Sequence, residues 1–369
     1  MLEFLNLTPE VFGLDINDPS LKIVKLKKKH GFLQPVSFIE KEIPNGTVDE
    51  GIIQDKKTFV KNLKEAMASV KGEKLKTRYV VASLPEEKSF SQVIKMPKMN
   101  SSELKTAVPF EAENYIPLPA DQMYLDFEEI TPATNQSDRL DILIVAVEKT
   151  IVDSYVSCLK EAGLIPIALE VETQAIARVL VKNKTSSGPV ALVDFGGDST
   201  DLIVFSGGSV RFTSSIPISS RQITSAISEN LGITLKEAEH MKVKYGLDSE
   251  SSNHRTKAVL KAVKPLFFEL VAEIQKYLDF YSGHDLNENP AKKNSKKNGI
   301  EKIILSGGGS NLRGIEEFLK EKLNIDVETG NPWINFPGIN KKSLPELQKN
   351  SLSFVTAIGL AMRGGEPNS

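Results

Sequence analysis

The sequence predicts an α/β protein made of two related halves, with a further α/β subdomain inserted into the first half. The main observation is an internal repeat, in which residues 14–26 align with residues 193–205 without a gap and Asp15 pairs with Asp194. Each copy has apolar residues on both sides of a polar turn, which is the pattern of a β-hairpin. Residues 86–163 have no counterpart in the second half, and 369 residues are enough for two domains.

The repeat also sets the predicted domain boundaries. The first half comprises residues 1–85 and 164–186, the inserted subdomain residues 86–163, and the second half residues 187–369 with a helical part at about 220–300. Each half opens with a three-stranded meander, the first at residues 11–42. Periodicity predicts further strands at 78–84, 92–97, 124–130, 140–147, 166–169 and 302–305, and helices at 55–71, 100–113, 149–162, 172–181, 219–231, 238–245 and 265–281.

Composition excludes several functional classes. A formal net charge of −2 and the lack of a basic stripe with interleaved aromatic residues argue against nucleic-acid binding. The single Cys158 excludes an internal disulfide, and the four histidines are too scattered for a metal cluster. The first residues lack the pattern of a signal peptide, and nothing approaches an apolar run of about 20 residues. We therefore expect a cytoplasmic protein.

Alternation in the first meander makes a prediction about charge. Lys22, Lys25 and Lys27 alternate with apolar residues between Leu21 and Lys29. In a half-buried strand, this pattern places the lysines on the solvent side.

The hairpin around Asp194 has the residues of a phosphate-binding turn. Gly196 and Gly197 let the backbone approach a ligand closely, and successive N–H groups in such a turn can bind phosphate oxygens. Ser199 and Thr200 add hydroxyl donors, and Asp194 could hold Mg²⁺. An ordinary hairpin with an Asp-rich turn is the alternative interpretation.

A second glycine-rich motif follows the predicted strand at 302–305. In Ser306-Gly-Gly-Gly-Ser-Asn311, the missing side chains could leave room for a base or sugar, and the next helix favours negative charge at its N-terminus. The alternative is a tight turn between a strand and a helix.

These motifs carry a family resemblance. Four of them resemble, in the right order, the phosphate, adenosine and connecting motifs of actin-like ATPases: Asp15-Ile-Asn-Asp-Pro-Ser20, Asp194-Phe-Gly-Gly-Asp-Ser-Thr200, Ser306-Gly-Gly-Gly-Ser-Asn311 and Ala357-Ile-Gly-Leu-Ala361. Others are similar to the PilM family of type IV pilus assembly: Gln92-Val-Ile-Lys-Met-Pro97, Phe110-Glu-Ala-Glu-Asn-Tyr-Ile-Pro117, Tyr124-Leu-Asp-Phe127, Gly163-Leu-Ile-Pro-Ile-Ala-Leu-Glu-Val-Glu172 and Asn331-Pro-Trp333. The similarity covers roughly residues 12–364.

The resemblance implies an actin-like fold, in which two ribonuclease H-like βββαβα halves are duplicated. It also implies an ATP-binding scaffold on the inner face of the cytoplasmic membrane, attached through partners. The implied partner is the cytoplasmic N-terminal tail of a PilN-like membrane protein, bound in a groove where the inserted subdomain meets the first half. An extended peptide could add to a strand edge there. Pilus motor ATPases are further implied partners, and self-association is left open.

The resemblance assigns roles to particular residues. It implies that Asp15 and Asp194 hold Mg²⁺ through water, and that Glu172 positions the attacking water. It implies phosphate contacts for Asn17, Ser20, Gly196, Gly197, Ser199 and Thr200. It implies adenosine contacts for Glu239, Lys242, Gly307, Gly308, Gly309 and Asn311. For Glu239, Lys242 and Glu172, the alternative is an exposed helix charge.

The first phosphate loop departs from the family pattern. Asn17, Asp18 and Pro19 stand where the family usually has a glycine and two serines. Proline lacks an N–H donor, and Asp18 would bring negative charge toward phosphate. This predicts weak nucleotide binding and weaker hydrolysis, so enzyme status stays open.

Two other functions of the same superfamily compete with the pilus scaffold. An FtsA-like division or cytoskeletal protein would have a C-terminal amphipathic membrane helix, whereas residues 361–369 are short, polar and helix-breaking. A small-molecule kinase would need a catalytic carboxylate beside a substrate pocket.

Overall fold

The structure is a computed structural model that describes residues 9–29, 31–116, 118–130, 139–247, 253–288, 299–339 and 344–364. Its contacts divide the described residues into two compact units, unit 1 up to Lys184 together with Pro332 onward, and unit 2 from Thr185 to Asn331. The predicted second half, 187–369, therefore extends beyond unit 2. The difference arises because helix α10 (Val355–Arg363) packs on strands and a helix of unit 1.

Unit 1 is built on a six-stranded sheet. Its strands, in sheet order, are β11 (Ile165–Val171), β7 (Tyr79–Leu84), β1 (Phe12–Ile16), β2 (Ser20–Lys29), β3 (Phe32–Glu42) and β6 (Lys71–Gly72). A two-stranded sheet, β4 (Val48–Asp49) and β5 (Ile52–Ile53), follows the meander. The helices are α1 (Lys56–Ala68), α3 (Lys149–Glu161), α4 (Glu172–Leu180), α9 (Pro345–Lys349) and α10 (Val355–Arg363). The predicted meander, the helices at 55–71, 149–162 and 172–181, and the strand at 166–169 are confirmed.

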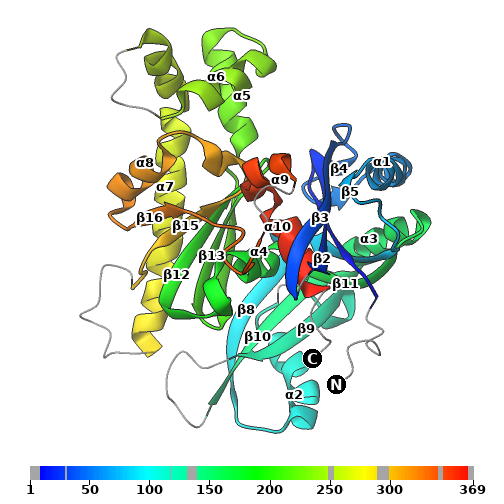
Figure 1. Cartoon of the computed structure of the whole chain (residues 1–369). Helices are drawn as coiled ribbons and strands as arrows, with labels where there is room; N and C mark the ends of the chain where they lie inside the picture. Colours follow the sequence, from blue (N-terminus) through cyan, green and yellow to red (C-terminus); the bar gives the residue numbers. More distant parts are fainter. Residues whose placement is uncertain are drawn as a thin grey trace. The chain divides into compact units, whose positions relative to one another are not determined.

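Helices cover both faces of this sheet. Side chains of β1 such as Leu14 share a core with Phe59 and Leu63 of α1. The alternate residue Gly13 lies against α10, where an added Cβ would overlap the carbonyl oxygen of Ala357. Figure 1 shows α10 in red beside the blue strands β2 and β3. The central strands are therefore buried on both sides.

This burial overturns the predicted exposure of the lysines on β2. The Lys25 side chain is only 3% exposed and pairs with Glu10 at 2.5 Å, and the Lys22 side chain is 15% exposed. Only Lys27, at 42%, lies on the solvent side as predicted. The prediction was wrong for Lys25 because this residue lies opposite Phe12, on the same face of β2 as the buried Leu21 and Ile23.

The inserted subdomain has its own small sheet and core. Its strands, in sheet order, are β8 (Ser89–Pro97), β10 (Arg139–Glu148) and β9 (Met123–Ile130), and its helix is α2 (Ser101–Ala112). Leu104 and Val108 of α2 pack on Ile142 and Ile144 of β10. A capping box formed by Asn100 and Glu103 begins this helix.

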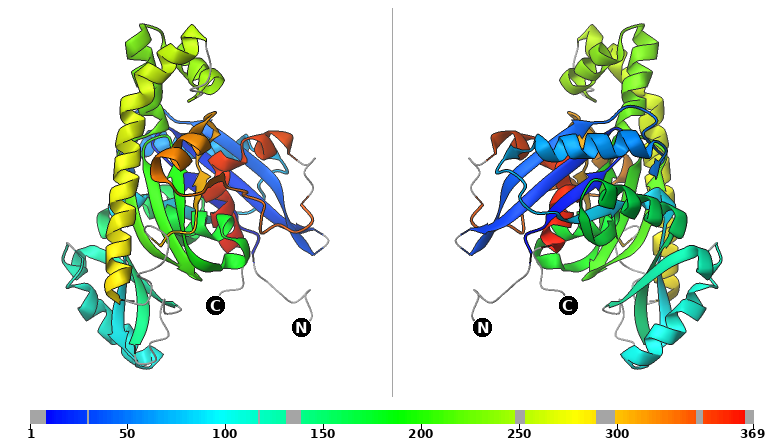
Figure 2. Two further views of the ribbon diagram at one scale, coloured as in Figure 1. Left: turned by 90° about the vertical axis from the view of Figure 1, so that its left-hand side faces the viewer. Right: turned by 90° about the vertical axis from the view of Figure 1, so that its right-hand side faces the viewer.

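Unit 2 combines a five-stranded sheet with long helices. The strands, in sheet order, are β14 (Ser209–Ile216), β13 (Thr200–Gly207), β12 (Ser186–Phe195), β15 (Ile303–Ser306) and β16 (Val327–Thr329). The helices are α5 (Ser220–Leu231), α6 (Leu235–Tyr245), α7 (His254–Glu288) and α8 (Ile315–Leu323). In Figure 2 the yellow helix α7 runs alongside the green strands of this sheet. Phe267 and Leu270 of α7 share a core with Val193 and Leu202 of the sheet.

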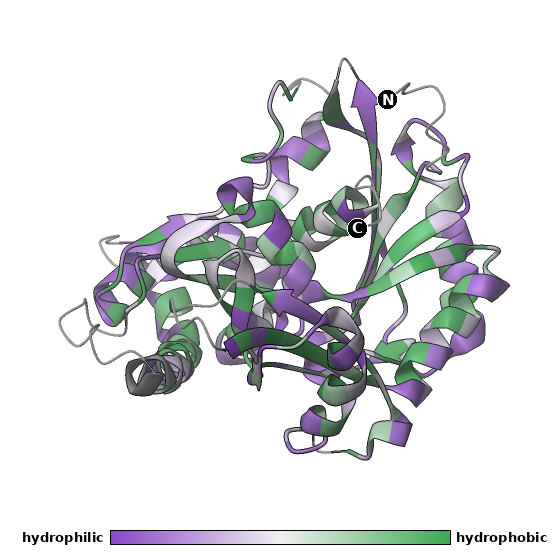
Figure 3. Ribbon diagram, turned by 90° about the horizontal axis from the view of Figure 1, so that it is seen from below, coloured by the Kyte–Doolittle hydropathy of each residue, from purple (hydrophilic) through white to green (hydrophobic). Residues whose placement is uncertain are grey.

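Short 3-10 helices complete the described chain: η2 (Glu86–Lys88), η3 (Ala120–Gln122), η4 (Lys182–Lys184), η6 (Gly308–Asn311) and η7 (Ser351–Phe354). Hydrophobic and hydrophilic residues alternate along single helices and strands in Figure 3, as amphipathic elements require. None of the helices in the described part of the chain is long and apolar enough to span a membrane.

The register of the strands confirms the internal repeat. In unit 1, β1 and β2 are antiparallel and Asp15 lies opposite Lys22. In unit 2, β12 and β13 are antiparallel and Asp194 lies opposite Asp201. Both hairpins thus pair residues seven apart around the aspartate that the repeat aligns.

Candidate functional site

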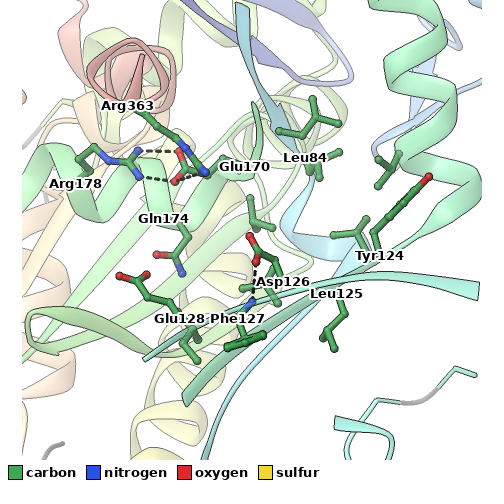
Figure 4. Close-up of a pocket in the computed structure, with 16 residues that line it drawn as sticks. Leu84, Tyr124, Leu125, Asp126, Phe127, Glu128, Glu170, Gln174, Arg178 and Arg363 are labelled. Carbon is green, nitrogen blue, oxygen red and sulfur yellow. Dashed lines mark hydrogen bonds and ion pairs between the residues drawn. The ribbon is translucent and has the colours of Figure 1, made fainter. Parts of the chain in front are cut away.

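A pocket of about 770 Å³ lies within unit 1, between the inserted subdomain and the six-stranded sheet (Figure 4). Two strands at sheet edges line it, β9 with residues 124–128 and β11 with residues 169–171. Val152 of α3, Gln174 and Arg178 of α4 and Arg363 of α10 complete these walls. The groove that the resemblance implied between the insertion and the first half is therefore present.

Alternation along β9 divides its side chains between two faces of the small sheet. Leu125 and Phe127 pack against the subdomain's own core, on the same side as α2. The opposite, pocket-side face carries the other side chains of this segment: Tyr124, Asp126 and Glu128. Their cross-strand neighbours on β10 are apolar: Val147, Val145 and Leu143. The pocket therefore combines an apolar floor with two carboxylates at its β9 edge.

Two arginines share one carboxylate on the α4 side of the pocket. Glu170 is 5% exposed and accepts hydrogen bonds from Arg178 on both carboxylate oxygens, with 2.7 Å between Nη1 and Oε2. Nη1 of Arg363 lies 3.0 Å from Oε1 of the same carboxylate, and this arginine side chain is 40% exposed. Two guanidinium groups and one carboxylate leave a net positive charge. This end of the pocket suits a hydrogen-bond acceptor or an anion.

Gln174 lies between these two charged regions. In Figure 4 its side chain extends from α4 between Glu170 and Glu128. Its Nε2 atom is buried and has no acceptor among the described residues. A buried N–H group without an acceptor costs about 1–3 kcal/mol, which a ligand acceptor would recover.

In unit 2, the structure brings the predicted phosphate turn together with the triple-glycine corner. Asp194 is the penultimate residue of β12 and pairs with Ser306 of β15, whose hydroxyl donates to Oδ1 of Asp194 at 2.6 Å. The Gly196 N–H donates to the carbonyl oxygens of Asp194 and Ser199, at 3.1 and 3.0 Å. Thr200 is fully buried and its hydroxyl donates to the carbonyl oxygen of Ile218 at 2.6 Å, so its role in the turn is structural.

Two glycines of the corner, Gly307 and Gly309, lie against Phe195. Gly307 has φ +83°, and an added Cβ would overlap the carbonyl oxygen of Phe195. At Gly309 an added Cβ would lie 2.5 Å from the Phe195 ring. Phe195 thus occupies the space beside Gly307 and Gly309 that side chains at these positions would need. Asn311, by contrast, is exposed, and its Nδ2 donates to the Gly308 carbonyl oxygen at 3.2 Å.

Lys242 and Glu239 form a network with the first turn of α5. Lys242 is 7% exposed, and its ammonium donates to Thr224, to Ser220 and to Glu239, at 2.7–3.1 Å. Burial lowers the pKa of Lys242, and its bond to Glu239 acts in the opposite direction. The Ser220 N–H donates to the Gly196 carbonyl oxygen at 3.0 Å, which connects this network to the turn. Lys242 therefore positions Glu239, whose side chain is 51% exposed.

In unit 1, the turn between β1 and β2 explains the departure at Asp18 and Pro19. The Asn17 N–H donates to the Ser20 carbonyl oxygen at 3.0 Å, and the Ser20 N–H donates back at 3.3 Å, so Pro19 needs no donor. The Asp18 carboxylate accepts from the N–H groups of Glu50 and Gly51, at 2.8 and 2.9 Å. Its charge is therefore engaged by backbone donors, contrary to the predicted approach to phosphate.

Asp15, Asn17 and Glu172 come together around Lys22. The Lys22 ammonium lies 3.7 Å from Oδ2 of Asp15 and 3.4 Å from Oδ1 of Asn17, whose Nδ2 donates to Glu172 at 3.3 Å. Asp15 is 2% exposed, and burial raises the pKa of its carboxyl while Lys22 acts in the opposite direction. Ser20 is also buried, at 3%. An ammonium group therefore lies among the carboxylate and amide groups of the predicted phosphate and metal residues.

The donor set limits how a metal could bind. No group of three His, Cys, Asp or Glu side chains in the described residues could hold an ion directly. Asp194 is half-buried at the end of β12, whereas Asp15 already faces a resident cation. Asp194 thus fits Mg²⁺ better than Asp15, provided that phosphate oxygens and water complete the shell.

Sequence reasoning missed several residues of these sites. Lys22 was assigned to solvent, and the pocket residues Gln174, Arg178 and Arg363 were given no role. Gln174 and Arg178 are four apart on a predicted helix, which places them on one face. The sequence alone offered no signal that Arg363 would join them.

Comparison with known proteins places the chain in a family. A sequence profile described as "Type IV pilus assembly protein PilM" matches residues 13–365. The chain belongs to this PilM family. Among solved structures, it is similar to a chain of the "PilM-PilN type IV pilus biogenesis complex", with 27% identity and a TM-score of 0.79 over 98% of this chain and 100% of the other.

More distant relatives agree on the fold. MreB5 of Spiroplasma citri bound to AMPPNP is 12% identical, with a TM-score of 0.57 and 96% of each chain covered. The cell division protein FtsA of Neisseria meningitidis serogroup B is 27% identical over 241 residues, 60% of this chain and 54% of FtsA. The chain thus spans about half the length of the FtsA proteins that it matches. The predicted actin-like fold with two domains is confirmed for this PilM-family chain.

Proposed function

We propose that this PilM-family chain is a cytoplasmic ATP-binding scaffold of the type IV pilus inner-membrane assembly complex. In this proposal, the pocket of unit 1 binds the cytoplasmic N-terminal tail of a PilN-like membrane protein. The observation that carries it is the pocket itself, which has an apolar floor and an unpaired strand edge within the described residues. The similarity to a chain of a PilM-PilN complex supports the choice of partner.

Membership in the PilM family favours the scaffold over the two competing functions. FtsA proteins match over only about half of their length, so their activity is a weaker guide. The described residues around the pocket are mainly apolar or engaged in the Arg178–Glu170–Arg363 ion pairs, which suits a peptide better than the substrate of a kinase. Contacts with motor ATPases and self-association remain separate proposals.

The proposed tail binding is tested with peptides from the N-terminal tails of membrane proteins encoded beside this gene. We expect one tail to bind, measured by fluorescence anisotropy with and without Mg-ATP. Val145→Arg places a charge on the apolar floor and should abolish binding. Val243→Arg, at an exposed position of α6, is the matched control and should bind normally. Equal binding by both variants would rule out this pocket.

We further propose that ATP and Mg²⁺ bind in unit 2, at several of the residues that the resemblance assigned. There, the phosphates would contact the backbone N–H groups of Gly196 and Gly197 and the Ser199 hydroxyl. Asp194 would hold Mg²⁺ through water. Gly308, Asn311 and Glu239 would contact adenosine. With Asp18 engaged by backbone donors and Glu172 bonded to Asn17, hydrolysis would be weak at most.

The nucleotide proposal is tested through ligand-induced stabilisation. A bound ligand stabilises the folded state by about 2.7 kcal/mol at 100 times its Kd. Mg-ATP should therefore raise the melting temperature of the wild type, and Asp194→Asn should reduce that shift strongly. Asp279→Asn, on an exposed side of α7, should retain it. An unchanged shift in Asp194→Asn would remove this turn from the site.

A further inference from the structure

The two strand edges at the pocket differ in their capacity to accept another strand. Residues 123–130 of β9 pair with β10 without a register shift and include no proline. On its other side β9 has no strand neighbour among the described residues. On β11, Pro166 lacks an N–H group and the register shifts between Pro166 and Ala168. An added strand therefore finds a regular row of donors and acceptors only on β9.

The exposed edge of β9 carries two carboxylates on the pocket side. Asp126 and Glu128 are two residues apart, so both lie on one face of the sheet. Asp126 accepts a hydrogen bond from the N–H of Phe127 at 2.9 Å. Neither carboxylate has an ion-pair partner among the residues that the structure describes. The nearby cation Lys149 is engaged elsewhere, since it donates to the Asp121 carbonyl oxygen and lies over the Tyr124 ring.

These features specify the chemistry of the bound segment. Opposite charges directly across neighbouring strands attract, so a strand added to β9 gains from a cation beside Asp126 and Glu128. On the α4 side, the unpaired Nε2 of Gln174 and the net positive charge of the Arg178–Glu170–Arg363 group favour a hydrogen-bond acceptor. The pocket thus carries carboxylates along β9 and hydrogen-bond donors along α4.

We propose that the partner segment binds as an added strand on β9, with a Lys or Arg beside Asp126 and Glu128 and an acceptor group at Gln174. This inference rests on the proposed tail binding. It adds the strand edge to which the tail binds, and the basic residue and the acceptor group in the tail that determine specificity. An acidic or purely apolar segment would bind poorly, because it would leave the two carboxylates unpaired or repelled.

The charge component is tested with the tail peptide that binds the wild type. Asp126→Asn combined with Glu128→Gln should weaken binding about tenfold and reduce its dependence on salt. Glu129→Gln, at an exposed position whose side chain lies on the other face of β9, is the matched control and should bind like the wild type. Charge reversal to Asp126→Lys and Glu128→Lys should bind best a peptide whose basic residue is changed to Glu.

The acceptor at Gln174 is tested with Gln174→Leu, which should weaken binding several-fold, whereas Gln174→Asn should lose less. For strand addition, peptides N-methylated at every second amide are compared. The set that removes donors facing β9 should lose binding, and the complementary set should keep it.

The outcomes distinguish a failure of the proposed tail binding from a failure of the proposed binding mode. If no tail binds the wild type, the proposed function fails. If a tail binds but the carboxylate variants retain its affinity and salt dependence, charge recognition is overturned and tail binding stands. Equal binding of both methylated peptides would overturn strand addition in the same way, and full affinity in Gln174→Leu would overturn the acceptor.

Discussion

In the triple-glycine corner after β15, one side chain determines which residues can lie beside it. Phe195 occupies the space beside Gly307 and Gly309, and its ring forms an edge-to-face contact with Phe267 at 6.0 Å. The triple-glycine motif therefore reflects close packing on Phe195, together with the positive φ of Gly307. Ser306, just before it, bonds to Asp194. The shape of the predicted phosphate turn depends on this packing.

We predict that Gly307→Ala destabilises the protein by about 3 kcal/mol, from positive φ and from overlap with Phe195. Gly232→Ala is the control in the same unit, because Gly232 has φ +64° and nothing within 4 Å of an added Cβ. It should cost only about 1 kcal/mol. The measurement is denaturant unfolding of each variant, and equal losses would show that Phe195 does not restrict this corner.

The buried Lys25 depends on Glu10 for its stability. Glu10 accepts from the ammonium at 2.5 Å, and this bond holds the pKa of Glu10 below its usual 4.5. We predict that Glu10→Gln costs about 1 kcal/mol at pH 7, a modest loss because Glu10 is half exposed to solvent. A carboxylate with a lowered folded pKa adds stability above pH 4.5 and loses it below. The difference between wild type and variant should therefore shrink as the pH falls below about 4.5.

This pH dependence is measured by urea unfolding between pH 3 and pH 8. Lys25→Met supplies the control, since Glu10 then has no buried cation to neutralise. In that background Glu10→Gln should cost little at any pH. A constant difference between wild type and Glu10→Gln across the range would show that the pair contributes nothing.

At the scale of the element, α4 connects several parts of unit 1. Its first residue, Glu172, accepts from Asn17, and its next turns carry Gln174 and Arg178 to the pocket. Its C-terminal end is held by Asn335, whose Nδ2 donates to the carbonyl oxygens of Arg178, Val179 and Val181 at 3.2, 3.1 and 2.9 Å. One side chain thus satisfies carbonyls that a helix end leaves unpaired.

We predict that Asn335→Ala destabilises unit 1 by about 1–2 kcal/mol and speeds hydrogen exchange at the end of α4. Asn335→Asp has the same shape but should be worse, because a carboxylate would face three carbonyl oxygens at a helix C-terminus. Exchange measured by mass spectrometry checks both variants. The cap would be unimportant if Asp and Ala at this position gave the same exchange as Asn.

Most elements could be predicted because local chemistry determines them. Alternation predicted β9 and β10, and capping boxes at Asn100 and Thr234 marked where α2 and α6 begin. The two-residue β6 has no local signal, and the second buried face of β2 depends on α10, which lies more than 300 residues later in the sequence. Periodicity in the sequence does not predict such contacts between distant segments.

The candidate sites were predictable to a different degree. The repeat located Asp15 and Asp194, and the unrepeated insertion indicated where a partner pocket could form. The sequence could not show that Lys22 faces Asp15 or that Asp18 turns toward Glu50 and Gly51, because both depend on side-chain directions within tight turns.

At the scale of the whole molecule, each unit has its own core. In unit 2, the fully buried Phe267 packs between Phe195 and Phe318. In unit 1, Phe59 of α1 is equally buried among residues of β1 and β2. The two cores share no residues.

We predict that Phe267→Ala, at a cost of about 3–5 kcal/mol, accelerates hydrogen exchange mainly in β12, β13 and β15. Phe59→Ala should do the same in β1, β2 and β3 and leave unit 2 protected. The reciprocal pair controls for a general loss of stability. Acceleration in both units by each variant would show that they unfold as one.

The packing of α10 on β1 also bears on the order of events during translation. The described residues of unit 2 all lie between Thr185 and Asn331, so they leave the ribosome before α10 is made. By contrast, one face of the six-stranded sheet stays uncovered until α10 has been synthesised. The nascent amino-terminal segment thus exposes an apolar sheet face, which needs protection from aggregation while the rest of the polypeptide is synthesised.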